Sequence, residues 1–345
     1  MTLERPRLDR RAFLALWGAG LVAPLATRAH AKAGALSIGL LRAPASAIVD
    51  LCDQHGWFNE AGVELESVLF AQAAGPKILQ ALGSGSIGLS FVNSTAALLG
   101  MAGGAIPLRI ISIPTDPSRL FAILSVDSID SMHALAGKRV AATGGTAVQY
   151  YLARALVKSG MTMKDIEFVN LPAADAQSAF VAGRVDAVVP PVTGRFYVMK
   201  TKKDARELFT YADFTKGPGP TQPFLNYDLF VTTEDVVQKS RPALKAFLAT
   251  YHDRGVPYLN DPKTRDDAMH TITEYINREQ KTPTDASIMR AIIDQSGFFD
   301  RKTTHALMTR EDFRASLEYQ VRFFMDLGRL KTAPDLDKAI VTDLL

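Results

Sequence analysis

Residues 81–89 read ALGSGSIGL, and residues 180–188 repeat the same plan as FVAGRVDAV. Each stretch contains the end of an apolar helix, a glycine that stops it, a short polar turn and an apolar strand. Strand-like runs alternate with helical runs around both copies from Leu36 onward, which is the pattern of an α/β chain with mostly parallel sheets. A repeated unit of this kind predicts a two-lobed protein with a ligand cleft between the lobes.

Hydrophobic periodicity places the elements of the two series. The first series has expected strands at 36–41, 63–70, 87–91, 109–113 and 121–126, and helices at 46–54, 76–82 and 96–101. The second has strands at 138–143, 166–171 and 186–189, and helices at 146–159 and 174–182. After a strand at 224–232 we expect only helices, at 242–258, 263–277, 285–296 and 310–327. The last carries an apolar stripe that predicts core packing: Phe313, Leu317, Val321 and Phe324.

The N-terminus has the features of an export signal. DRRAFL at 9–14 precedes an apolar run at 15–26, and AHA at 29–31 has the small residues of a cleavage site. Paired arginines before such a run are typical of a twin-arginine signal, so we expect residues 1–31 to be removed and the mature chain to begin near Lys32. The apolar run is too short to span a bilayer. The alternative is an amphipathic or disordered N-terminus, and the expected location is the periplasm or the cell exterior.

Charge and cysteine content exclude several classes of function. Five of the 39 basic residues and two of the 36 acidic residues lie in the first 31 positions, which leaves the remainder balanced at 34 of each. A neutral mature chain argues against partnership with nucleic acid or an anionic membrane. Cys52 is the single cysteine, so an internal disulfide and a multi-cysteine metal site are excluded. It shares a helical face with Ile48 and Leu51, which favours a buried small side chain over a nucleophile.

Two strand-to-helix junctions are candidate ligand sites. At residues 91–95 and at 142–147 an apolar strand stops at small or hydroxyl residues and a helix begins. Free backbone amides and the helix dipole favour an anion at such a point, and parallel strands bring these ends to one edge of a sheet. Ordinary helix capping by Asn, Ser and Thr is the equal alternative.

Catalytic motifs are absent from the sequence. It has no Gly-x-Ser-x-Gly elbow, no Walker loop and no dinucleotide fingerprint after the first strand. Its histidines beyond the signal are not at metal-ligand spacing, and most are expected at the surface or at helix caps: His55, His133, His252, His270 and His305. Carboxylates are expected to be solvated. We therefore expect no catalytic residue, no metal and no cofactor.

Several motifs, in order, resemble the periplasmic substrate-binding proteins of ABC importers for aliphatic sulfonates, taurine, nitrate and thiamine precursors. They are HGWFNEAGVEL at 55–65, LAGKRVA at 135–141 followed by GGT at 144–146, LPAADA at 171–176, AGRVDA at 182–187 and FFMDLG at 323–328. The chain departs from the family where relatives often carry a Trp-Asp-Pro-like segment, since it has PPVT at 190–193, and where they often end the first strand in polar or aromatic residues, since it has Leu40 and Leu41.

The resemblance implies a type II periplasmic binding fold with a helical C-terminal region. Lobe 1 would comprise residues 32–124 and 228–345, and lobe 2 residues 125–227, joined by crossing strands near 121–126 and 224–232. It also implies candidate polar contacts: Ser46, Asn93, Ser94, Gly145, Thr146, Thr193 and Asn226. Arg42 is the nearest basic residue past the first strand and is a candidate for meeting an anion, with a surface role as its alternative.

The function implied is a solute-binding component, without catalysis, that closes over a small anionic organic solute or nitrate and delivers it to an ABC permease. The expected partners are that solute and the membrane subunits, and the protein is expected to be a monomer. One alternative is an enzyme on the same fold, a desulfinase or a pyrimidine-precursor synthase, for which Cys52 would be the only thiol nucleophile. A sensor module that reports its ligand state to a membrane receptor is the other.

Overall fold

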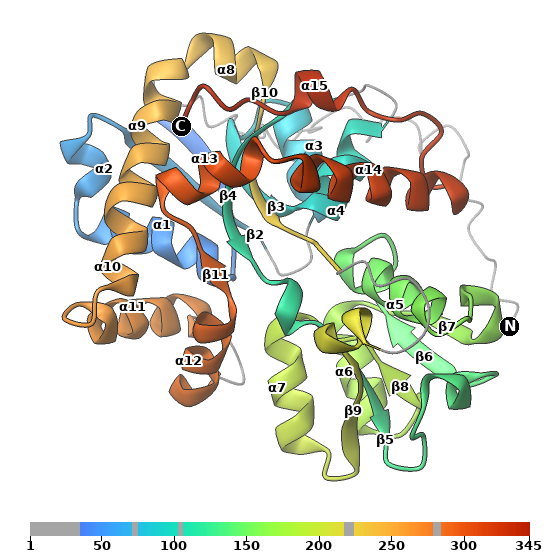
Figure 1. The fold of residues 1–345 in the computed structure, drawn as a ribbon. Coiled ribbons are helices and arrows are strands. Elements are labelled where there is room, and N and C mark those ends of the chain that lie inside the picture. Colours follow the sequence, from blue (N-terminus) through green and yellow to red (C-terminus); the bar gives the residue numbers. More distant parts are fainter. Residues whose placement is uncertain (1–34, 71–74, 103–105, 217–223, 279–283) are drawn as a thin grey trace, which may run out of the picture. The chain divides into compact units, whose positions relative to one another are not determined.

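The computed structural model describes residues 35–345 except 71–74, 103–105, 217–223 and 279–283. The expected signal at 1–31 lies outside the described residues. Within them the strands form two β-sheets (Figure 1). We call sheet A the one with strand order β11-β4-β10-β3-β1-β2, and sheet B the one with order β7-β6-β8-β5-β9.

The strands have the following bounds. Sheet A contains β1 Ala35–Leu41, β2 Glu64–Phe70, β3 Leu89–Asn93, β4 Leu108–Asp116, β10 Asp228–Thr233 and β11 Gly297–Phe298. Sheet B contains β5 Ala122–Val126, β6 Arg139–Ala142, β7 Glu167–Asn170, β8 Ala187–Val188 and β9 Ala205–Thr210.

Helices connect these strands and make up most of the C-terminal third. Those between strands of sheet A are α1 Pro44–Gln54, α2 Trp57–Glu60, α3 Gly75–Gly83 and α4 Ser94–Met101, and those between strands of sheet B are α5 Ala147–Lys158, α6 Ala173–Val181 and α7 Val192–Thr201. After β10 follow α8 Glu234–Lys239, α9 Arg241–Thr250, the π-helical turn η7 Tyr251–Gly255, α10 Val256–Asn260, α11 Arg265–Asn277, α12 Ala286–Gln295, α13 Arg301–Met308, α14 Glu311–Asp326 and α15 Leu336–Ala339. Short 3₁₀ turns are η3 Ser118–Leu120, η4 Met132–Leu135, η5 Met163–Asp165 and η6 Tyr211–Thr215.

Both sheets are mixed: as predicted, most strands of each sheet share one direction, and the strands that run against them are β10 and β11 in sheet A and β5 in sheet B. β1 runs parallel to β2 and β3, and β6 runs parallel to β7 and β8, as βαβ units require. β10 is antiparallel to β3 and β4, and β5 is antiparallel to β8 and β9. The reason is that β5 and β10 are each entered from the other sheet, so no crossover helix within their own sheet fixes their direction.

The chain passes between the sheets at two places. It leaves sheet A at the end of β4, passes through η3 and enters sheet B as β5 (Figure 1). It returns after η6 and re-enters sheet A as β10, with residues 217–223 of the return outside the description. Both connecting segments lead directly to strands that end or begin at the pocket described below.

Apolar faces of the predicted helices form the cores. Ile48, Leu51 and Cys52 on α1 are fully buried, which confirms the shared helical face, and α1 closes at His55 before Gly56, whose φ of 72° is readily adopted only by glycine. The α14 stripe of Phe313, Leu317, Val321 and Phe324 is buried, as predicted. No helix among the described residues is long and apolar enough to cross a membrane.

Among the elements that depart from the sequence prediction are β11, α7 and β9. β11 lies in the segment expected to be only helical, because Phe298 pairs with Thr115 on β4 and so extends sheet A. α7 and β9 were not predicted. α7 follows two prolines and has hardly any amphipathic pattern. β9 reads ARELFT, and its adjacent charged residues Arg206 and Glu207 interrupt the alternation of apolar and polar residues that is typical of a strand. β9 lies at the edge of sheet B, where a half-exposed strand tolerates such residues.

Candidate functional site

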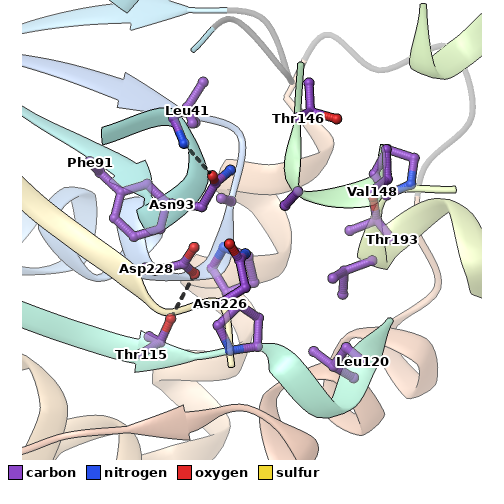
Figure 2. Close-up of a pocket in the computed structure, with 18 of the residues that line it drawn as sticks. Leu41, Phe91, Asn93, Thr115, Leu120, Thr146, Val148, Thr193, Asn226 and Asp228 are labelled. Carbon is purple, nitrogen blue, oxygen red and sulfur yellow. Dashed lines mark hydrogen bonds between the residues drawn. The ribbon is translucent and has the colours of Figure 1, made fainter. Parts of the chain in front are cut away.

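A pocket of about 210 Å³ is lined by residues from both sheets (Figure 2). From sheet A come Leu41, Phe91, Asn93, Thr115 and Asp228. From the sheet B side come Thr143, Gly145, Thr146, Val148, Val192 and Thr193. The connecting segments supply Pro117, Leu120, Phe121 and Asn226, and the α12–β11 region supplies Ile292, Ser296 and Phe298.

Strand direction explains why these residues meet. The parallel strands β1, β3 and β6 all end here, and ligands of open α/β sheets enter at the carboxyl ends of such strands. The antiparallel strand β10 begins here, and β4 ends here before the chain leaves for sheet B. The pocket therefore includes both points at which the chain changes sheets.

The pocket wall is mostly apolar. Three phenylalanines form its aromatic part: Phe91, Phe121 and Phe298. Phenylalanines distributed over distant strands carry no local motif, which is why sequence reasoning missed them. Most small-molecule sites combine such a wall with a few polar groups that orient the ligand.

Six of the eight predicted contact residues line the pocket: Arg42, Asn93, Gly145, Thr146, Thr193 and Asn226. Ser46 and Ser94 are fully buried and lie outside the lining. The Ser46 hydroxyl accepts a hydrogen bond from the Leu41 amide at 3.2 Å, and Ser94 Oγ lies 3.1 Å from Asn226 Oδ1. Both serines therefore support neighbouring pocket residues from behind.

Arg42 directs its guanidinium to a backbone oxygen. Its Nη1 donates to the Tyr275 carbonyl at 2.6 Å, and its guanidinium carbon lies 5.5 Å from the centre of the Tyr275 ring. The side chain thereby ties the end of β1 to α11. In this structure its charge is held against α11.

At the two junctions many amides are already bonded within the protein. Asn93 Oδ1 accepts from the Ala96 amide at 2.9 Å, which is the helix cap that the sequence analysis gave as an alternative. At the second junction the Gly144 amide donates to Asn170 Oδ1 at 2.8 Å, and the Gly145 amide donates to Gln149 Oε1 at 2.7 Å. An anion here would have to replace these side-chain oxygens.

Asp228, which sequence reasoning missed, is the carboxylate of the pocket. Thr115 Oγ1 donates to its Oδ2 at 2.8 Å, shown as a dashed line in Figure 2. Burial is the main cause that raises the pKa of Asp228 to about 7; the nearby Asp116 acts in the same direction, and the Thr115 hydrogen bond opposes the shift. A charged residue inside the apolar run 224–231 was the signal available in the sequence.

Asn226 is held by buried hydroxyls. The side-chain Oδ1 of Asn226 lies 3.1 Å from Ser94 Oγ and 3.0 Å from Thr95 Oγ1. The backbone amide of Asn226 donates to Ser118 Oγ at 2.9 Å. Its side chain is fully buried, and Nδ2 is the single buried side-chain nitrogen or oxygen among the described residues that has no hydrogen-bond partner. Such a group is costly unless a ligand meets it.

The lone cysteine is remote from this chemistry. Cys52 is fully buried within α1 and is not part of the pocket lining. Burial raises the pKa of its thiol to about 12, so the nucleophilic thiolate is scarce at neutral pH. No cluster of metal-ligating side chains occurs in the part of the chain that the structure describes.

One histidine departs from the surface or cap role expected for most. His252 is fully buried, with Nε2 2.6 Å from Ser112 Oγ and Nδ1 2.7 Å from the Phe299 carbonyl. Burial lowers its pKa to about 4, so it is neutral at pH 7. It lies outside the pocket lining and joins η7 to β4 and the segment after β11.

Known proteins resemble this chain in sequence and in fold. A protein named as a binding protein in Brucella abortus is 24% identical over 210 residues, which cover 60% of this chain and 61% of the relative. One named as an aliphatic sulfonates-binding protein in Escherichia coli K12 is 30% identical over 175 residues, 50% of this chain and 54% of the relative. The chain thus matches less than two thirds of the length of either relative.

Solved structures extend the likeness to most of the chain. The crystal structure of the periplasmic aliphatic sulphonate binding protein SsuA from Escherichia coli has a TM-score of 0.72 at 20% identity, covering 90% of this chain and 92% of that one. The fold is therefore that of the periplasmic binding proteins. A family model described as NMT1/THI5 like matches residues 44–264, well over half of the sequence. The chain belongs to the NMT1/THI5-like family.

Proposed function

We propose that this chain is the solute-binding component of an ABC importer, which holds a small organic solute in the pocket between sheets A and B and delivers it to a permease. The observation that carries the proposal is the pocket itself, whose lining comes from the strand ends of both sheets and from both connecting segments. The family membership and the names of the matched relatives support it.

The proposed lobes are residues 32–124 with 228–345, and residues 125–227. Closure would be a hinge motion at the connecting segments, because a solute that contacts both sides stabilises the closed state. We assign direct contact to Asn93, Gly145, Thr146, Thr193 and Asn226. Ser46 and Ser94 act behind the lining, and Arg42 joins the site if a solute draws it from the Tyr275 carbonyl.

The anionic solute that the sequence analysis favours would place its charge on the sheet B side of the pocket. Asp228 lies on the sheet A side, where its carboxylate repels an anion. On the opposite side, Thr143 Oγ1 donates to the Leu171 carbonyl and Thr146 Oγ1 to the Thr143 carbonyl. Thr193 therefore supplies the hydroxyl of this side that is not already committed to a described backbone oxygen. The proposal therefore favours an organic solute whose two ends differ over a symmetric inorganic ion such as nitrate.

Export by the twin-arginine pathway, a periplasmic location, a permease partner and a monomeric state belong to the same proposal. The arginine pair at Arg10 and Arg11 supports the export route. The balanced charge of residues 32–345 fits a protein that meets neither nucleic acid nor an anionic bilayer.

A desulfinase-like enzyme is the less favoured function. It needs a nucleophile in the pocket, and the sole cysteine is buried in α1 with a raised pKa. No feature of the pocket favours the synthase alternative over binding.

Thermal unfolding of purified protein lacking residues 1–31 tests the proposal. A compound that binds only the folded state raises the melting temperature by mass action, by an amount set by its concentration relative to Kd. The panel would contain sulfonates, aminosulfonates, aromatic carboxylates, amides, pyrimidines and nitrate. Saturable stabilisation, with the same compound recovered unchanged by mass spectrometry, supports the proposal. Conversion of a stabilising compound to a product contradicts it, and so does the absence of any stabilisation together with no co-purifying solute in native mass spectrometry.

A further inference from the structure

Four polar residues form one row on the sheet A side of the pocket. Asp228 on β10 is in register with Asn93 on β3 and, across the other edge, with Thr115 on β4. Directly opposed residues of adjacent strands project to the same face with Cβ atoms roughly 4.5–5.5 Å apart. Asn226 precedes Asp228 by two residues, the spacing that returns a side chain to the same side of an extended chain. All four line the pocket.

The hydrogen bonds of this row leave one oxygen of Asp228 and the side-chain nitrogens of Asn93 and Asn226 uncommitted among the described residues. Thr115 Oγ1 donates to Oδ2 of Asp228, whereas Oδ1 of Asp228 accepts no hydrogen bond from the described residues. Asn226 Oδ1 is met by the hydroxyls of Ser94 and Thr95, while its Nδ2 is buried without a partner. The carboxylate of Asp228 and the side-chain amide of Asn226, which are two residues apart in the sequence, therefore lie at one end of the pocket (Figure 2).

The charges around Asp228 favour a hydrogen-bond donor at its free oxygen. Its charged neighbour is Asp116 at the end of β4, a second carboxyl, whose Oδ1 accepts from the Ser118 amide at 2.9 Å. The Arg42 guanidinium lines the same pocket but donates to the Tyr275 carbonyl. An anionic group at Asp228 would meet like charge, whereas an N–H group would relieve it.

We propose that Asp228 and Asn226 recognise a nitrogen-bearing group of the solute, with an N–H donated to Asp228 Oδ1 and an adjacent acceptor meeting Asn226 Nδ2. The solute class is then an amine, amide or amino-substituted heterocycle. A sulfonate or carboxylate without nitrogen lacks the donor. This inference rests on the proposed function, because it assigns the chemistry of the solute that the pocket holds.

Matched pairs of probes that differ in their N–H group test the inference. The pairs are taurine with ethanesulfonate, 4-aminopyrimidine with pyrimidine, and benzamide with methyl benzoate, measured by thermal stabilisation and calorimetry at pH 8. In at least one pair the N–H compound should bind about tenfold more tightly or better, the ratio that one charge-assisted hydrogen bond supplies. The taurine pair tests an ammonium group, and the other two test neutral N–H donors.

Two variants locate the preference. Asp228→Asn should reduce the N–H preference to about threefold or less and leave the affinity for the partner compound within about threefold. Asp116→Asn, which changes the neighbouring carboxyl outside the lining, should retain the preference. If Asp228→Asn does not fold, the wild-type affinities within each pair still show whether the pocket prefers the N–H compound.

The outcomes separate this inference from the proposed function. Equal affinities within every pair that binds would overturn the inference while leaving the binding function intact, as would a preference that survives in Asp228→Asn. If no compound in any pair binds the wild type, the result counts against the proposed function, and this inference falls with it.

Discussion

Replacing Asp228 with asparagine should stabilise the solute-free protein, and the gain should grow as the pH rises. Burial and the neighbouring Asp116 raise the pKa of Asp228 from 3.8 to about 7, so its ionised form is disfavoured in the folded state. Asparagine retains an oxygen that accepts the Thr115 hydrogen bond but carries no charge. The variant removes the electrostatic cost and preserves the local geometry.

The sign and size follow from linkage. A carboxyl whose pKa is higher in the folded state binds its proton more tightly there, so its ionisation destabilises the fold. The free-energy cost of ionising Asp228 in the folded protein is absent below pH 3.8, grows as the pH rises from 3.8 to 7 and is complete above pH 7. At 1.36 kcal/mol per pKa unit it reaches about 1.6 kcal/mol at pH 5 and about 4 kcal/mol at pH 8. These are upper limits, because Asp228 is partly exposed in the pocket.

Urea unfolding of both proteins at pH 5, 6, 7 and 8, after removal of bound solute by denaturation and refolding, measures the effect. The free-energy difference should widen by roughly 2 to 3 kcal/mol between pH 5 and pH 8. His252 titrates in both proteins, so its contribution cancels. Asp186→Asn is the control of opposite sign, because a hydrogen bond from Arg139 lowers the pKa of Asp186, and this variant should lose stability at pH 7 and approach the wild type as the pH falls. A difference that does not change with pH would refute the reasoning.

Three further predictions address the site, the cysteine and export. Gly145 and Gly183 both have φ of 71°, and a Cβ on either meets no atom within 4 Å, so alanine at each should cost a similar 1 to 2 kcal/mol or so of stability from backbone strain. Only Gly145→Ala should also weaken solute binding in calorimetry, and equal affinity in both variants would remove Gly145 from the site. Cys52→Ala should leave affinity within about twofold and lower stability by roughly 1 kcal/mol, while native wild type should resist iodoacetamide at pH 8, where only about one thiol in ten thousand is ionised. Changing Arg10 and Arg11 to lysine should leave the precursor in the cytoplasm by immunoblotting of cell fractions, and efficient export of that variant would contradict the twin-arginine route.

Local patterns predicted the elements whose signals lie within a few residues. Asn93 ends an apolar strand and caps the next helix through its bond to the Ala96 amide, a short-range signal visible in the sequence. The glycines at 56 and 160 close helices with φ of 72°, and both helix ends were predicted. Strand direction was less accessible, because β5 and β10 take their orientation from the other sheet.

The candidate site was predicted only where it coincides with such local signals. Asn93, Gly145 and Thr146 lie at strand-to-helix junctions and line the pocket. Asp228 was missed because its meaning depends on register: its neighbours Asn93 and Thr115 lie more than a hundred residues away in sequence. Most aspartates in folded proteins are exposed to solvent, so the sequence alone predicts an exposed side chain for Asp228.

The uncommitted groups of the polar row connect stability to recognition. Without solute, a buried amide nitrogen on Asn226 lacks a partner, and ionised Asp228 destabilises the fold at neutral pH. A solute that meets both groups contributes those interactions in addition to the apolar contact with Phe91, Phe121 and Phe298. Binding should therefore raise the melting temperature more in the wild type than in Asp228→Asn at pH 8, even though the variant is the more stable protein without solute. Because Asn226 and Asp228 end the segment that returns from sheet B, the same contacts act where the two proposed lobes are joined.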